Sequence, residues 1–227
     1  MFQIMRNLLI LFTLFFPALG AVGAGAPGSK ISQLADGKIS GKTYSNDALD
    51  LRSEIPSGWV AYADPKGPVS LDSQEPDGPV NRCSKVLLSL HPAQPGEGGF
   101  NSTATLFAVD PRCFSDAKLP KALEDRKKIL KFAGKIVKAF SNTPYITQKG
   151  ADVDADRVGG RLTIILKGER VINAVEGSDQ STHKAVHVNT LLTVMESNGY
   201  WVVWSASVDD ASRETLKNTN MSFRALP

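Results

Sequence analysis

The chain has 227 residues, of which 42% are hydrophobic and 22% are charged. This length and composition fit one globular domain and exclude a disordered chain, and a core of this size needs no structural metal or array of disulfides. The formal net charge of +3 is too small to indicate a protein that binds nucleic acid.

The first 24 residues have the order of a secretory signal peptide. Arg6 is the only charged residue before the apolar run at residues 8–16, and small residues follow Pro17. The apolar run is too short to cross a bilayer, and no later segment is apolar for long enough. We therefore expect an exported protein, periplasmic or secreted, without a transmembrane segment in the mature chain. Cleavage is expected after Ala24, with Gly20 as the alternative.

Residues 25–42 are polar and glycine-rich without a clean period, so we expect a flexible leader before a single domain at residues 43–227. Residues 37–43 resemble a phosphate-binding loop but are one residue short between the glycines, and no apolar strand precedes them. Residues 44–59 predict two short strands around a turn. Residues 64–79 are rich in proline and glycine and predict a long mobile loop.

Cys83 and Cys113 are the only cysteines, and export keeps such a pair oxidised. Residues 85–91 and 102–109 are rich in β-branched and apolar residues and predict two strands. Antiparallel pairing about a centre near Gly98 places the two cysteines directly opposite each other, with Cα atoms about 4.5–5.5 Å apart. We therefore predict a disulfide, with two buried free thiols as the alternative.

Residues 119–140 predict the one long helix, central to the fold. Pro120 lies at its start, acidic residues follow in the first turn, and apolar side chains recur on one face. Lysines line another face at spacings of four, four and three residues: Lys127, Lys131, Lys135 and Lys138. Such a stripe is ordinarily the solvated face of an amphipathic helix. The functional alternative is a surface for an anionic partner, either an acidic protein or a membrane surface.

Four strands follow the helix, and the sequence places them at residues 145–157, 162–167, 185–195 and 200–208. Gly159-Gly160 and Asn198-Gly199 predict the turns of two hairpins. Asp209 and Asp210 predict the cap of a short C-terminal helix. Because strands dominate, the predicted fold class is α+β with a mostly antiparallel sheet.

Several of these landmarks together resemble the PsbP-like family. They are Tyr44-x-Asn46, Leu51, Ile55-Pro56-x-Gly58-Trp59, Gly199-Tyr200-Trp201, Leu216 and Ser222-Phe223, and they cover about residues 43–224. The family includes the extrinsic oxygen-evolving subunit of photosystem II and many exported bacterial proteins without assigned roles. The resemblance implies an α/β/α sandwich and a role in binding rather than catalysis. No metal-binding or partner-binding residue of the better-known members matches, so none is carried over.

Two groups of residues resemble metal sites but fail on spacing. Residues 152–156 carry three alternating aspartates, like the opening of a calcium loop, but Arg157 and Thr163 stand where glycine and glutamate are required. A strand with solvated aspartates is the simpler interpretation. His183 and His187 fall on a predicted strand about 13 Å apart, which is too far for one zinc ion.

The sequence offers no nucleophile, because no serine lies in Gly-x-Ser-x-Gly or Ser-x-x-Lys and the histidines have no activating context. We therefore expect no catalytic residue, cofactor or metal. The leading hypothesis is an exported, non-enzymatic binding or accessory protein that acts on an unknown protein or envelope partner. The alternative is a small-ligand carrier or an enzyme with a pocket between the sheet and the loop at residues 64–79.

Overall fold

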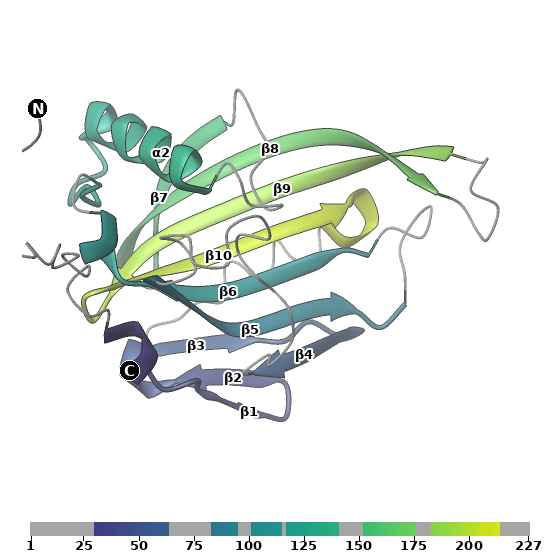
Figure 1. Cartoon of the computed structure of the whole chain (residues 1–227), viewed down its shortest axis with the longest axis horizontal. Helices are drawn as coiled ribbons and strands as arrows, with labels where there is room; N and C mark the ends of the chain where they lie inside the picture. The colour runs from purple at the N-terminus through teal and green to yellow at the C-terminus, as the bar shows by residue number, and fades with distance from the viewer. Residues whose placement is uncertain are drawn as a thin grey trace, which may run out of the picture.

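The computed structural model describes residues 30–63, 83–94, 101–114, 117–140, 152–175 and 183–213. These residues form a seven-stranded sheet, a three-stranded sheet and one long helix (Figure 1). The predicted signal peptide, the predicted loop at residues 64–79 and the end of the predicted C-terminal helix lie outside the described residues.

Every strand pair within the described residues is antiparallel. The small sheet has the order β1-β2-β3 and the long sheet the order β4-β5-β6-β10-β9-β8-β7. The strands are β1 (Lys38–Ser40), β2 (Thr43–Asn46), β3 (Leu51–Glu54), β4 (Trp59–Ala63), β5 (Ser84–Pro92), β6 (Thr103–Val109), β7 (Asp152–Val158), β8 (Arg161–Val175), β9 (His183–Ser197) and β10 (Tyr200–Asp209). The helix is α2 (Arg126–Phe140), and the short 3₁₀ helices are η1 (Lys30–Gln33), η2 (Asp47–Leu49) and η4 (Pro111–Phe114).

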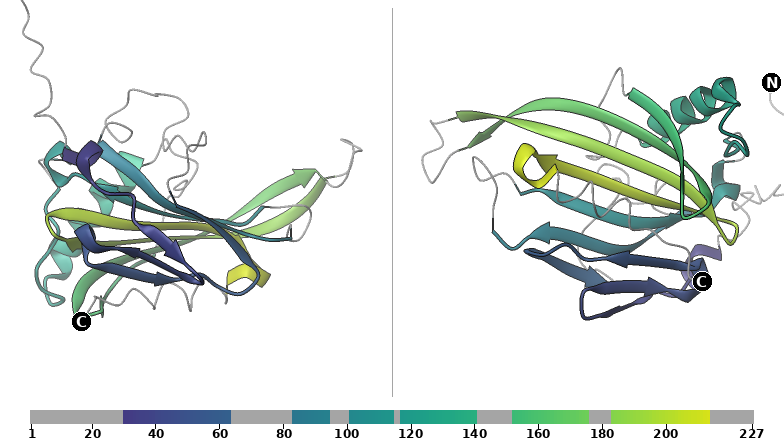
Figure 2. Two further views of the ribbon diagram at one scale, coloured as in Figure 1. Left: turned by 90° about the horizontal axis from the view of Figure 1, so that it is seen from below. Right: turned by 180° about the vertical axis from the view of Figure 1, so that it is seen from behind.

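Both hairpins predicted after the helix are confirmed. Asn198 and Gly199 have φ angles of 49° and 81° and join β9 to β10, as a two-residue turn with positive φ at both positions requires. Gly159 and Gly160 join β7 to β8 in the same way. β8 and β9 continue past their neighbours, since β10 pairs with β9 only from Val188 onward, and their far ends project as a two-stranded arm (Figure 2).

The two faces of the long sheet belong to two separate cores. On one face, Tyr44 and Leu51 of the small sheet pack with Leu106 and Trp204 of the long sheet. The opposite face packs against α2. The α2 side chains there are Ile129, Phe132 and Ile136, and the sheet residues include Phe107, Ile164, Trp201 and Val203. Alternation along β10 therefore sends Trp201 and Trp204 to opposite faces.

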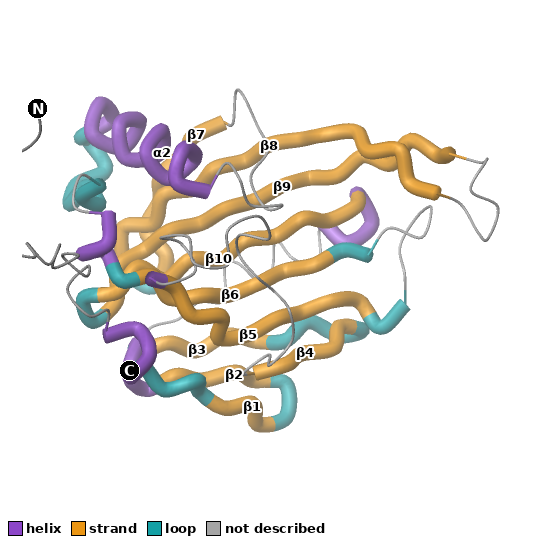
Figure 3. Tube along the Cα trace, viewed as in Figure 1, coloured by secondary structure: helices purple, strands orange, loops and turns teal. Residues whose placement is uncertain are grey.

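The predicted class, α+β with a mostly antiparallel sheet, is confirmed, and strands dominate the described residues (Figure 3). The α/β/α layering that the family resemblance implies is not what these residues show. Among the described residues, the layer that packs on the face opposite α2 is the small sheet. The polar hairpin at residues 38–46 forms this layer because Tyr44 points inward from it and is fully buried.

The predicted long helix is shorter than expected, because it begins at Arg126 and not at residue 119. Proline disfavours helical geometry in the residue before it, and Pro120 and Leu119 are not helical. The first helical hydrogen bond runs from the Ile129 amide to the Asp125 carbonyl over 3.0 Å. Asp125 therefore stands at the N-cap, where aspartate is favoured, and not in the first turn.

Residues 30–42, which belong to the predicted leader, include regular elements and buried side chains. They contain η1 and β1, and Ile31 and Leu34 are buried in the core beneath the small sheet. Two apolar side chains in a short polar stretch give no periodic signal, which is why the sequence pattern missed them.

Candidate functional site

Helix α2 presents its lysines to solvent because most of its apolar side chains pack against the sheet. Ile129, Phe132, Ala133 and Ile136 are buried, and Phe132 meets Trp201 edge-on with ring centroids 5.3 Å apart. The remaining face therefore points away from the sheet. This agrees with the helical period on which the lysine prediction depended.

The four predicted lysines do not share one environment. Lys127 and Lys131 are exposed one turn apart, whereas Lys135 is half-buried. The side chain of Lys138 lies outside the described residues. Leu130 is 48% exposed beside them, so the outward face of α2 combines positive charge with an exposed apolar side chain.

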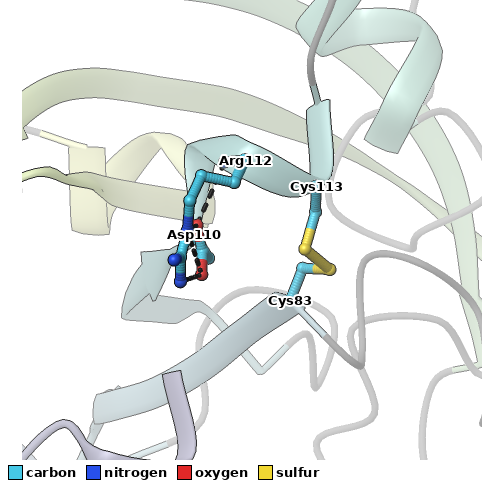
Figure 4. The surroundings of a disulfide bond; sticks show 4 residues. All are labelled: Cys83, Asp110, Arg112 and Cys113. Atoms are coloured by element: carbon cyan, nitrogen blue, oxygen red, sulfur yellow. Dashed lines mark hydrogen bonds and ion pairs between the residues drawn. A yellow bond between two sulfur atoms is a disulfide. The ribbon is translucent and has the colours of Figure 1, made fainter. Parts of the chain in front are cut away.

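The disulfide between Cys83 and Cys113 is present, with Cα atoms 6.1 Å apart (Figure 4). Next to it, the carboxylate of the buried Asp110 accepts hydrogen bonds from the Arg112 backbone amide at 3.0 Å and from its guanidinium at 2.9 Å. The hydrogen bond to Asp110 raises the pKa of Arg112 above its already high ordinary value. The disulfide and the Asp110–Arg112 hydrogen bonds together hold η4 against the start of β5.

The geometry that predicted this disulfide was wrong, although the pairing was right. In the observed register Ser84 pairs with Val109, and a bulge between Val86 and Leu88 shifts the rest of the ladder. The Asp110 amide donates to the Cys83 carbonyl at 2.7 Å, so Cys83 lies beside Asp110 and not opposite Cys113. The η4 turn then brings Cys113 back within reach.

The motif Tyr44-x-Asn46, which carries part of the family resemblance, has a structural role here. The Tyr44 hydroxyl donates to the Asp36 carbonyl at 2.6 Å, and the Asn46 amide donates to the Ala35 carbonyl at 2.7 Å. Gly37 has φ 83°, and a Cβ there would lie 2.5 Å from the Tyr44 hydroxyl, so this position needs glycine. Burial raises the pKa of Tyr44 to about 12, against a smaller lowering by Asn46.

The residues that resemble metal sites are spread along strands. The aspartates of residues 152–156 are exposed on β7, and Val153 and Ala155 between them point toward the α2 core. His183 and His187 lie four residues apart along β9, and the side chain of His183 lies outside the described residues. Across the described ranges no group of three or more metal-ligating side chains converges.

The β7 edge of the long sheet is capped by its own side chains. The amides of Ala155 and Arg157 donate to the carboxylates of Asp154 and Asp156 at 2.8 and 2.7 Å. The guanidinium of Arg126, at the start of α2, donates to the Val153 carbonyl at 2.7 Å. These three backbone groups are therefore occupied, which makes this edge less able to pair with another strand.

The structure also assembles hydroxyl groups that the sequence pattern missed. Ser89 of β5 pairs with Thr105 of β6, and Thr105 pairs with Ser205 of β10, so the three lie in one row across the sheet. Ser207 is the next residue on the same face of β10 and pairs with Thr103. No local motif marks these residues, because they come from strands far apart in the sequence. The change from tryptophan and valine to serine along β10 is the signal that could have found them.

In the parts of the chain that the structure describes, no helix is long and apolar enough to cross a membrane. No protein-family model matches the sequence, and no curated protein matches it. Among solved structures, the chain is similar to the cyanobacterial PsbP (CyanoP) of Synechocystis sp. PCC 6803, with 13% identity, a TM-score of 0.43, and coverage of 84% of this chain and 98% of that one. It is also similar to LpqN, which is involved in cell envelope biogenesis of Mycobacterium tuberculosis, with 17% identity, a TM-score of 0.35, and coverage of 75% and 77%. At these scores the likenesses carry no argument about function.

Proposed function

We propose that the chain is an exported, non-enzymatic accessory protein that binds an acidic surface of a protein partner through the outward face of α2. The observation that carries the proposal is the exposure of Lys127 and Lys131 on a helix whose other face is completely docked. Among the described residues, no carboxylate forms an ion pair with either lysine. A cationic surface of this kind favours association with an anionic one.

Export is part of this proposal, and two independent features support it. The first 24 residues have the order of a signal peptide, and disulfides such as Cys83–Cys113 persist in oxidising compartments outside the cytoplasm. Membership of the PsbP-like family is likewise an inference. It rests on the sequence landmarks between Tyr44 and Phe223.

The test is a charge reversal on α2. The double variant Lys127→Glu/Lys131→Glu and the native chain, both tagged, are used to capture proteins from envelope extract and culture supernatant. We expect a specific protein that the native chain retains at low salt, loses at high salt, and binds at least about tenfold more strongly than the variant.

A matched control separates the position of the charges from their number. Lys38 and Lys42 are also exposed and four residues apart, but they lie on the β1–β2 hairpin. The variant Lys38→Glu/Lys42→Glu should retain the partner. Equal loss in both variants would show that only net charge matters. Equal binding by the α2 variant and the native chain would remove α2 as the surface, and binding of both lysine pairs to anionic vesicles would replace the protein partner with a membrane.

A further inference from the structure

The face of the long sheet that packs on α2 changes chemistry along its strands. Trp201 and Val203 of β10 lie beneath the helix in an apolar core. The next two residues on the same face of that strand are Ser205 and Ser207. The hydroxyl row therefore begins where the apolar packing against α2 ends.

The row spans four neighbouring strands. Tyr62 of β4 pairs with Ser89, Ser89 with Thr105, and Thr105 with Ser205, and directly paired residues project from the same face of a sheet. Three strand spacings give the row a length of about 14 Å. A second row beside it joins Ser207 to Thr103 on one side and to Thr190 on the other; its members also carry hydroxyls.

The middle of this surface is buried without being satisfied. Ser205 is 1% exposed and Ser207 is 6% exposed, and the hydroxyl oxygens of Ser89, Ser205 and Ser207 have no hydrogen-bond partner among the described residues. A buried hydroxyl without a partner costs stability, so three on one face demand an explanation. Ser53 is a further such group, but it lies alone on β3.

The end of the row at β4 is open and aromatic. Tyr62 is 50% exposed, and its ring stacks on His91 with centroids 5.4 Å apart and planes inclined by 25°. The surface thus runs from an accessible aromatic pair at the sheet edge to buried hydroxyls at its centre. An aromatic pair beside a small number of directed polar groups is a combination that small-molecule sites also use.

We propose that this surface, the hydroxyl row from Tyr62 to Ser205 with Ser207 beside it, binds a neutral polyhydroxyl ligand, that is, a sugar. Serine hydroxyls both donate and accept hydrogen bonds, as the hydroxyls of a sugar do, and the C–H face of a sugar ring packs on an aromatic ring. An apolar ligand leaves the buried serine hydroxyls unsatisfied. An anion is disfavoured by Asp209, the buried acid that follows Ser207 on the same face.

The experiment titrates the full chain with a panel of neutral mono- and disaccharides by calorimetry, with an aliphatic alcohol of similar size as the apolar comparison. We expect at least one sugar to bind with a dissociation constant between about 10 μM and 1 mM, and the alcohol not to bind. Ser205→Ala/Ser207→Ala should weaken sugar binding by about tenfold to thirtyfold, because two hydrogen bonds are lost. Tyr62→Ala should weaken it as well.

Two controls protect the interpretation. Ser53→Ala removes a buried hydroxyl of the same kind far from the row and should leave binding unchanged. The melting temperature of Ser205→Ala/Ser207→Ala should equal or exceed that of the native chain, since the hydroxyls have no protein partner to lose. The proposal is overturned if no sugar binds, which would mean that the row holds ordered water only, or if the serine variant binds as the native chain does. Because Lys127→Glu/Lys131→Glu leaves this face intact, its failure to lose a protein partner would not affect the sugar result.

Discussion

Tyr44 offers the sharpest test of what stabilises the small sheet, because its hydroxyl oxygen alone makes its side-chain hydrogen bonds. Tyr44→Phe keeps the buried ring and removes only the hydroxyl that donates to the Asp36 carbonyl at 2.6 Å and accepts from Asn46 at 3.3 Å. The loss of one good buried hydrogen bond lowers the free energy of unfolding by about 1 kcal/mol at pH 7.

At alkaline pH, Tyr44→Phe should become as stable as the native chain or more stable. Burial raises the pKa of Tyr44 from 10.0 to about 12 in the folded state, so the folded state holds this proton more tightly than the unfolded state does. The stabilisation is complete below pH 10 and is lost as the pH rises from 10 through 12. At pH 11 the loss is RT ln[(1 + 10)/(1 + 0.1)], or about 1.4 kcal/mol, and it approaches about 2.7 kcal/mol at higher pH.

The assay is urea unfolding of both proteins at pH 7, 9, 10 and 11, followed by tryptophan fluorescence. The native chain should be more stable by about 1 kcal/mol at pH 7, and Tyr44→Phe should match or exceed it near pH 11. All other ionisable groups are the same in both proteins, so their contributions cancel in the difference. If the free energies of unfolding of the two proteins differ by the same amount at every pH, Tyr44 ionises as freely in the folded state as in the unfolded one.

Two further predictions concern the disulfide and the β7 edge of the long sheet. Reduction of Cys83–Cys113, which closes a loop with a sequence separation of 30, should lower the free energy of unfolding by about 3.6 kcal/mol in the chain-entropy model, and urea unfolding with and without reductant measures it; no change on reduction would contradict this. Asp154→Ala/Asp156→Ala uncaps two edge amides and should increase self-association in light scattering, whereas Asp152→Ala should not. Equal behaviour of the two aspartate variants would show that charge, and not the capping hydrogen bonds, protects the edge.

The features predicted correctly from the sequence depend on neighbouring residues. The Asn198-Gly199 turn fixes its own backbone conformation, and the alternation that follows it fixes which side chains of β10 enter the core. The face of α2 that carries Lys127 and Lys131 follows from the helical period alone. Such signals are contained in windows of ten or twenty residues, and tertiary packing did not alter them.

The errors arose where a short irregular turn changed a regular pattern. One bulged position after Val86 and the single turn η4 were enough to move Cys83 from opposite Cys113 to beside Asp110. The start of α2 was misplaced because Pro120 suits the first turn of a helix in general, and only the contacts of the following residues decide whether a helix begins there. Neither effect leaves a periodic trace in the sequence.

The hydroxyl row could not be predicted, because its residues meet only through the strand order β5-β6-β10. Even so, the residues of β10 show that the change to hydroxyls occurs on only one of its two faces. A strand that runs into solvent becomes polar on both faces, but Ala206 and Val208 remain buried in the core opposite Ser205 and Ser207. The change to hydroxyls is therefore confined to the α2 side of a central, buried strand. Packing alone would favour valine at these positions, and a ligand that uses the hydroxyls is the reason we give for serine.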